Sequence, residues 1–313
     1  MQLVRHLSDL PYRELEQGSV VTIGSYDGLH PGHCHLLDRV IAEAKARGVP
    51  SIVMSFEPTP KEFFSADAPP ARLMRFREKY DALKEYGVGL FYCPKFSEAM
   101  RSITADAFIR KVLIHGLHAS HSVIGDEFQF ARRREGSIAE LQRAAPALGY
   151  SIEQVPSVIV DGIRVSSTAI REALASGNVA RATALLGRPY RMSGRIGRGR
   201  RVGRELGYAT ANVDLRRRQS AVMGIYAVRV HGLPEGPVDG VASVGTRPTF
   251  DLTKPLLEVH LFDFDRDIYG QYIHVDFIEH LRDEEKFDTV EALVAQMQID
   301  EQNARSALAM DRA

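Results

Sequence analysis

Residues 24–33 read GSYDGLHPGH and follow directly on the apolar run VVTI of residues 20–23. Three glycines in this stretch let the backbone turn tightly and approach a ligand closely. His30 and His33 are one helical turn apart, so both imidazoles lie on one side of a helix that begins here. The start of such a helix offers unpaired N–H groups and a positive dipole end. A strand, a glycine-rich turn and a helix in this order predict a site for nucleotide phosphates.

The run His33-Cys34-His35 leaves a metal site as an alternative. Adjacent residues of a helix point in different directions, and no second group of ligands follows at the spacing of a zinc site. A single histidine is most often an ordinary surface or core residue, but a pair framed by glycines after a strand is a specific pattern. We therefore favour the phosphate hypothesis.

The first 187 residues alternate apolar strands with amphipathic helices. Helix 33–48 shows this most clearly, because Leu36, Leu37, Val40, Ile41 and Ala44 share one face and Gly48 follows its end. The alternation predicts a mostly parallel, Rossmann-like sheet with helices on both faces, which binds ligands at the carboxyl ends of its strands. Further strands are expected at 51–56, 88–93, 119–125 and 151–155, and further helices at 78–87, 106–117 and 136–149.

The pattern changes near residues 187–190, after which short strands are separated by turns. This predicts a small antiparallel β-barrel, closed by a helix from about Thr289 with Val290, Leu293 and Val294 at helical spacing. The predicted domains are residues 1–187 and 188–313. Strands are expected at 190–197, 224–230, 237–245, 256–264 and 272–281.

The bulk composition narrows the class of protein. The chain has 313 residues, a formal net charge of zero and two cysteines, Cys34 and Cys93. The length favours two domains, and the charge argues against a dedicated nucleic-acid binder. Two cysteines provide no disulfide framework, and we find neither a signal peptide nor a membrane span. A cytoplasmic protein is expected.

A second segment with binding chemistry is RVSSTAIREAL, residues 164–174. Its hydroxyl side chains are typical of a capped helix start, which alone is the simpler explanation. Beside the turn of residues 24–33, its hydroxyls and arginines look like the other half of a nucleotide clamp. The residues concerned are Arg164, Ser167, Thr168 and Arg171.

These two motifs, followed by LLGRPY, resemble the bacterial bifunctional riboflavin kinase/FMN adenylyltransferases, also called FAD synthetases. The resemblance covers essentially the whole chain. The family pattern Gly-x-Phe-Asp-Gly-x-His-x-Gly-His implies ATP-phosphate binding, with His30 and His33 as the catalytic pair. The matching residues are Gly24, Asp27, Gly28, His30, Gly32 and His33.

The resemblance extends to the second domain through SGRIGRGRRVGRELGYATAN, residues 193–212. It implies that Thr210 and Asn212 bind ATP and Mg²⁺, and that Glu258 is the catalytic carboxylate. It also implies flavin contacts from Glu127, Phe128 and Arg282. The glycine-rich flap would bind phosphate through Gly199, Gly203 and Arg204.

The implied function is phosphorylation of riboflavin to FMN, then adenylylation of FMN to FAD with release of pyrophosphate. ATP is the co-substrate and Mg²⁺ the metal, with no nucleic-acid or membrane partner. The arginine triplets 132–134 and 216–218 could suggest a site for RNA or DNA, but no aromatic residues lie among them to stack on bases. We expect these triplets to be solvated loops or helix ends. Oligomeric state is not predicted.

Several positions depart from the family pattern. Tyr26 replaces phenylalanine, which is a mild change. Ala131 replaces a glycine and is expected to alter the local backbone. These departures leave two alternatives open: an enzyme that uses an altered flavin or retains one activity, and a non-catalytic flavin-binding protein. The retained His30, His33 and Glu258 favour catalysis. The other departures are Thr59 for histidine, Glu127 for aspartate or asparagine, Ala209 for proline and Ser243 for asparagine.

Overall fold

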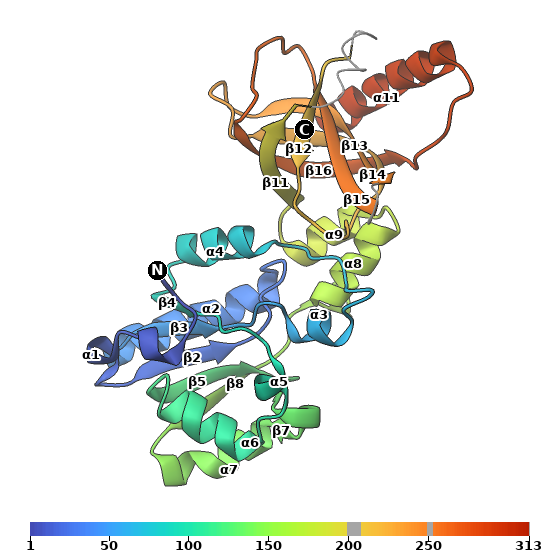
Figure 1. Ribbon diagram of the computed structural model, residues 1–313. Helices are drawn as coiled ribbons and strands as arrows, with labels where there is room; N and C mark the ends of the chain where they lie inside the picture. The colour runs from blue at the N-terminus through green and yellow to red at the C-terminus, as the bar shows by residue number, and fades with distance from the viewer. Residues whose placement is uncertain (199–207, 249–252, 313) are drawn as a thin grey trace. The chain divides into compact units, whose positions relative to one another are not determined.

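The computed structural model describes residues 1–198, 208–248 and 253–312, and the chain forms two compact units (Figure 1). The first unit contains Met1–Pro70 and Met74–Val165, and the second contains Ala71–Leu73 and Ser166–Ala313. The compact units thus divide earlier than the predicted limit at residue 187, because two helices after Val165 belong with the barrel. A limit at residue 187 between two functional domains stays a prediction.

The first unit is built on a six-stranded sheet in which every paired strand is parallel, as predicted. Its strand order is β1-β4-β3-β2-β5-β8. The order reverses between β2 and β5, so a topological switch point lies where β2 ends and the glycine-rich turn begins. The strands are β1 (Gln2–Val4), β2 (Ser19–Ile23), β3 (Ser51–Met54), β4 (Leu90–Tyr92), β5 (Ala119–Gly125) and β8 (Ser151–Val155).

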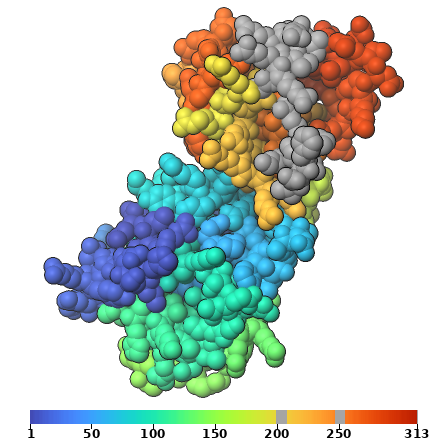
Figure 2. Space-filling model, in the orientation of Figure 1, coloured from blue at the N-terminus to red at the C-terminus, as the bar shows by residue number. Residues whose placement is uncertain are grey.

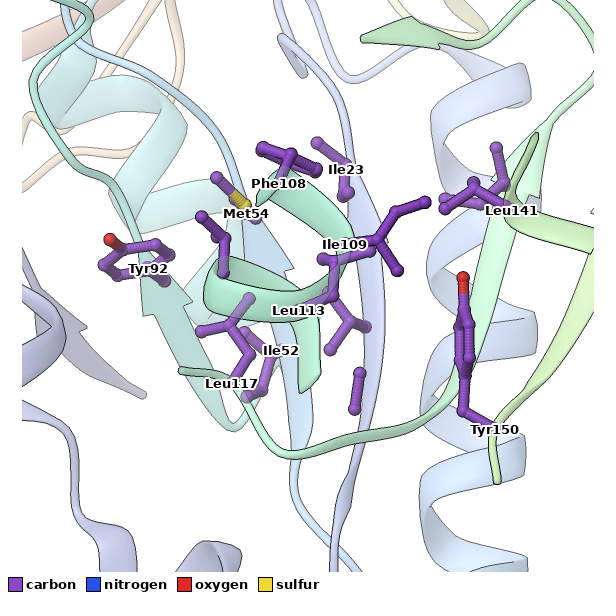
Figure 3. Close-up of a cluster of buried hydrophobic side chains, with 14 of the residues drawn as sticks. Ile23, Ile52, Met54, Tyr92, Phe108, Ile109, Leu113, Leu117, Leu141 and Tyr150 are labelled. Carbon is purple, nitrogen blue, oxygen red and sulfur yellow. The ribbon is translucent and has the colours of Figure 1, made fainter. Parts of the chain in front are cut away.

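Helices cover both faces of this sheet (Figure 1). On one face α2 and α4 bury Leu37, Val40 and Leu83. On the other face α7 and a π-helical segment, η2, close the larger core, and Figure 3 shows side chains of η2 with those of β2 and β3 in that core. The helices are α1 (Tyr12–Leu15), α2 (Pro31–Arg47), α3 (Pro60–Phe64), α4 (Phe76–Glu85), α5 (Glu98–Arg101), α6 (Ala105–Ala107), η2 (Phe108–Ile114) and α7 (Ile138–Leu148).

Helix α2 begins and ends where its sequence predicts. His30 is the N-cap and Pro31 occupies the first turn, where its missing N–H costs nothing. Gly48 ends the helix in the left-handed conformation, at φ 67°, which glycine adopts without strain. These caps place the histidine pair at the carboxyl edge of the sheet.

The second unit is a closed six-stranded barrel with the order β11-β12-β15-β14-β13-β16. The predicted strands of this unit are confirmed, but β12 was not predicted. In the first unit β1 was not predicted either, nor were the two-residue strands β6 (Gln129–Phe130), β7 (Gly136–Ser137), β9 (Ile159–Val160) and β10 (Ile163–Arg164). Alternate residues fill the interior, as Leu257 and Val259 on β15 show, both with no exposed surface. The strands are β11 (Tyr190–Gly197), β12 (Thr210–Asp214), β13 (Gly224–His231), β14 (Val238–Pro248), β15 (Thr253–Leu261) and β16 (Tyr272–Arg282).

Among the residues of this unit that the structure describes, three helices complete it: α8 (Ser167–Ala175), α9 (Val179–Leu186) and α11 (Val290–Met310). The last begins where predicted, with Thr289 as its N-cap. It packs against β13, β14 and β16 through Ala304, Ala307 and Leu308, and its outer face is at the surface in Figure 2 (red). Helix α9 contacts β11 and β16, which is why it belongs to the barrel unit.

Candidate active sites

The turn between β2 and α2 is held in an unusual backbone conformation. Tyr26, Gly28 and Leu29 all have positive φ angles, of 48°, 96° and 46°. The buried Tyr26 hydroxyl is hydrogen-bonded to Thr22 Oγ1 at 2.7 Å, and its ring lies so close to Gly24 that a Cβ there would be only 3.0 Å away. Gly24 therefore leaves room for the tyrosine, and the turn is fixed before any ligand arrives.

The two histidines of the turn are brought together. Their rings are stacked, with centroids 3.7 Å apart and planes 17° apart. The His33 backbone N–H donates to His30 Nδ1 at 3.4 Å, which leaves His30 Nε2 to carry the ring proton. His33 Nδ1 is buried and has no hydrogen-bond partner among the described residues. Neutral imidazoles in this arrangement can donate N–H bonds to phosphate oxygens.

Burial keeps both imidazoles neutral. It lowers the pKa of His30 to about 4, against a raising effect of Asp27 and a further lowering by Arg164. The pKa of His33 lies well below its ordinary value, because of burial first and then the charges of His30 and Lys79. Each ring therefore presents a donor without a permanent charge at neutral pH.

This pKa shift predicts an acid-sensitive stability. The unfolded chain takes up a proton at His30 near pH 6.5, whereas the folded chain does so only near pH 4. The free energy of unfolding should therefore fall as the pH falls through this interval, by at most about 3 kcal/mol from His30. Urea unfolding at several pH values should show this slope in the wild type and a weaker slope in His30→Asn. An equal slope in both proteins would contradict the shift.

Other predicted residues of the first unit have structural partners. Asp27 is 6% exposed, and its Oδ1 accepts the Met74 backbone N–H at 2.8 Å. Arg164, on β10 (Ile163–Arg164), forms an ion pair with Glu127, so the structure joins a predicted nucleotide residue to a predicted flavin residue. Phe128 stacks on Phe130 with ring centroids 5.5 Å apart.

The expectation for Ala131 was wrong, because its backbone keeps a conformation typical of glycine. Ala131 has φ 66° and ψ −176°, a region that residues with a Cβ rarely occupy. The strands β6 (Gln129–Phe130) and β7 (Gly136–Ser137) pair around this turn, and Arg132 donates its N–H to Ile103 O at 2.9 Å. These bonds hold the turn, so the alanine bears the strain.

Ala131→Gly should consequently stabilise the first unit by about 1 kcal/mol, since relief of backbone strain outweighs the added freedom of the unfolded chain. Denaturant unfolding is the measurement. Ala139→Gly, at an exposed position of α7, is the control and should have the opposite sign. A destabilised Ala131→Gly protein would contradict the argument.

Thr59, which departs from the family histidine, has a local role. It is the N-cap of α3 and forms a capping box with Glu62, whose Oε2 accepts the Thr59 N–H at 2.9 Å. A histidine lacks the short hydroxyl that this cap uses. The substitution therefore exchanges a larger polar side chain for a better helix start.

The second predicted nucleotide segment lies on α8. Ser166 is its N-cap and accepts the Ala169 N–H at 3.2 Å, which confirms the predicted helix start. Arg171 donates through Nε to Ala71 O at 2.6 Å and through Nη1 to Ser167 O at 3.1 Å. These residues belong to the second unit, and the roles of Ser167, Thr168 and Arg171 in nucleotide binding stay predictions.

The barrel brings together the residues implied for phosphoryl transfer. Asn212 on β12 and Ser243 on β14 are the cross-strand partners of Glu258 on β15, one on each side. Thr210 is the partner of His260 in the same way. Directly paired residues have Cβ atoms about 4.5–5.5 Å apart and point to one face, here the outer face of the barrel. We call Thr210, Asn212, Ser243 and Glu258 the carboxylate face.

Two features of the carboxylate face bear on its chemistry. Asn212 Oδ1 is buried and has no hydrogen-bond partner among the described residues, so it is available to a cation or a donor. His260 Nδ1 lies 3.0 Å from the carbonyl oxygen of Ala209, which sits where the family has proline. The flap residues Gly199, Gly203 and Arg204 lie outside the described residues.

Arg282, predicted to contact flavin, is held by α11. Its Nε and Nη2 donate to the two carboxylate oxygens of Asp300 at 2.8 and 2.7 Å, and Asp300 is 4% exposed. Gln296 adds a bond to Asp300 at 3.0 Å. This bidentate pair fixes α11 to the end of β16.

The prediction that the arginine triplet 216–218 is solvated was wrong for one of its residues. Arg217 is 7% exposed rather than solvated, and its guanidinium donates to the carbonyl oxygens of Arg72 and Leu73. The sequence gives no local sign of this, because the bonded carbonyls are more than 140 residues away. Arg132, Arg133 and Arg134 are exposed, as predicted.

A parallel α/β unit with a glycine-rich turn that carries two stacked histidines, joined to a barrel with a carboxylate face, defines a class: transferases that act on nucleotides. Residues 12–169 match the family model of FAD synthetase, and residues 186–308 match that of riboflavin kinase. The chain belongs to the bifunctional riboflavin kinase/FMN adenylyltransferase family, whose activities serve flavin cofactor synthesis.

Curated relatives of that name match over nearly the whole chain. The Escherichia coli K12 protein is 43% identical over 305 residues, which cover 97% of each chain. The Pseudomonas fluorescens protein is 42% identical over 310 residues, which cover 99% of this chain and 98% of that one. The Haemophilus influenzae protein is 40% identical over 307 residues, or 98% of this chain and 99% of the relative.

A solved structure shares the fold. A crystal structure from Streptococcus pneumoniae, named a macrolide-efflux protein, aligns with a TM-score of 0.80 at 32% identity and covers 97% of this chain and 98% of its own. Among the residues described for the present chain, no helix is long and apolar enough to cross a membrane.

Proposed function

We propose that this chain phosphorylates riboflavin to FMN on the barrel and adenylylates FMN to FAD at the turn of residues 24–33. The observation that supports this best is the register of the carboxylate face, which sets Glu258 directly opposite Asn212. A base beside a hard oxygen ligand is the arrangement that phosphoryl transfer from ATP requires. The functional domains are then 1–187 and 188–313.

In the kinase step, the Glu258 carboxylate accepts the proton of the terminal ribityl hydroxyl. The hydroxyl oxygen attacks the γ-phosphorus, the bond to the bridging oxygen breaks, and ADP leaves. The chain fits Mg²⁺ here, because Thr210 and Asn212 present side-chain oxygens on one face of β12 and Asn212 Oδ1 has no hydrogen-bond partner among the described residues. Bound with the ATP phosphates, the ion would neutralise their charge. Gly199, Gly203 and Arg204 would cover those phosphates.

In the adenylyl step, a phosphate oxygen of FMN attacks the α-phosphorus of ATP, and pyrophosphate leaves. His30 and His33 donate N–H bonds to phosphate oxygens, and the start of α2 adds backbone N–H groups. Gly28 permits the tight approach. The remaining residues assigned to this nucleotide are Gly24, Asp27, Gly32, Arg164, Ser167, Thr168 and Arg171.

The flavin contacts proposed from the family pattern rest on residues with defined neighbours. Glu127, paired with Arg164, and Phe128, stacked on Phe130, would contact the flavin of the adenylyl site. Arg282 would contact the flavin of the kinase site and is oriented for that by Asp300. Each side chain is anchored by a partner in the same unit.

A single time course tests this proposal. The purified protein is incubated with riboflavin, ATP and Mg²⁺, and FMN and FAD are separated by chromatography. FMN appearing first and FAD second is the expected result. FMN alone would mean that Thr59, Glu127 and Ala131 have removed adenylyl transfer, and no product would point to an altered flavin or to a binding protein.

A further inference from the structure

The residues that flank α4 on both sides are hydrogen-bonded to the glycine-rich turn and to α2. At the first end the Met74 N–H donates to Asp27 Oδ1 at 2.8 Å. At the other end the Tyr86 hydroxyl donates to Asp38 Oδ1 at 2.7 Å and to Cys34 O at 3.3 Å. These bonds, and the cluster that Leu83 shares with Tyr26 and Leu37, place α4 beside the turn and α2.

The buried residues of α4 are Leu83 and one lysine. Leu83 packs with Tyr26, Leu29 and Leu37 in one cluster. Lys79 precedes Leu83 by one helical turn, so it lies on the same face, and it is only 3% exposed. Lysines are rarely buried to this degree without polar or charged partners, because desolvating an ammonium group costs much free energy.

The charge of Lys79 acts on the histidine pair. After burial, the charges of His30 and Lys79 lower the pKa of His33. For His30, Asp27 raises the pKa and Arg164 lowers it. The two positive side chains, Lys79 and Arg164, thus act on different rings of the stack. Lys79 also favours the neutral state of His33, because a nearby positive charge opposes protonation.

We propose that Lys79 is a positioning residue of the adenylyl site, a fixed positive charge behind His33 that attracts the triphosphate and stabilises the departing pyrophosphate. This rests on the proposed adenylyl transfer at the turn of residues 24–33. Lys79 acts through the potential at the start of α2, where its charge adds to the helix dipole. A buried charge needs no reorganisation when negative charge develops, and the low local dielectric strengthens its effect.

The test compares Lys79→Met, Lys79→Arg and the exposed control Lys84→Met on the same helix. Lys79→Met should lower kcat/KM for ATP in FMN adenylylation by about 10- to 100-fold. It should also move the acidic limb of the pH profile to higher pH, because His33 then protonates more readily. Lys79→Arg should stay within about threefold of the wild type, since it retains the charge. Riboflavin phosphorylation, measured in the same samples, should not change.

The proposal would be overturned if Lys79→Met adenylylated FMN at the wild-type rate. It would also be overturned if Lys79→Met and Lys79→Arg lost equal amounts of adenylyl transfer without a shift of the acidic limb of the pH profile. A measurement on the wild type needs no folded variant: the ¹⁵N ammonium resonance of Lys79, assigned as the one missing in Lys79→Arg, should shift when pyrophosphate binds. No shift on saturation overturns the role. A wild type that binds pyrophosphate but makes no FAD would instead refute the proposed function.

Discussion

Glu258→Gln should lower FMN formation from riboflavin by about 10²- to 10⁴-fold, while added FMN is still converted to FAD. Glutamine keeps the size of the side chain and its place opposite Asn212 and Ser243, but it cannot accept the proton of the ribityl hydroxyl. The chemistry of the kinase step is lost without a change in packing. Chromatographic rates with riboflavin and with FMN as separate substrates measure the effect.

Glu279→Gln is the matched control, because Glu279 is an exposed carboxylate on β16 of the same barrel. It should leave both rates unchanged. If a folded Glu258→Gln protein lost both activities together, the assignment of one reaction to each domain would be wrong. If it lost neither, Glu258 would not be the base.

His30→Ala should have the reverse effect and lower FAD formation from FMN by about 10²- to 10³-fold. The ring that is removed caps α2, stacks on His33 at 3.7 Å and provides an Nε2–H to the phosphates. Because the stack is built before ATP binds, its loss removes a preorganised donor. Riboflavin phosphorylation is expected to continue at the wild-type rate.

The control for this variant is His35→Ala, since His35 is exposed on the same helix and two residues beyond His33. It should retain both activities. An effect of His30→Ala would then be due to the position of His30 at the phosphate site and not to the removal of any histidine from α2. An FAD yield from His30→Ala equal to that of the wild type would remove His30 from the site.

The departures from the family pattern have different physical meanings. Thr59 improves a helix cap, whereas Ala131 stores backbone strain in a turn that the family builds with glycine. Ser243 stands directly beside Glu258, where a shorter side chain changes the surroundings of the proposed base. None of these differences was readable from composition or periodicity, because each depends on a cap, a φ angle or a strand register.

The amino-acid sequence by itself determined the two architectures, the limits of α2 and the start of α11. It also predicted a phosphate site at the turn of residues 24–33, and that site stays a prediction. Those features follow from local periodicity, caps and glycine spacing, which neighbouring residues decide.

Only the tertiary structure decided the stacking and neutrality of the histidine pair, the alignment of Asn212 and Ser243 on Glu258, and the burial of Lys79 and Arg217. Strand register and helix packing set these, because they join residues far apart in the chain. A residue's charge and solvation depend on such distant neighbours, and no short stretch of sequence contains them.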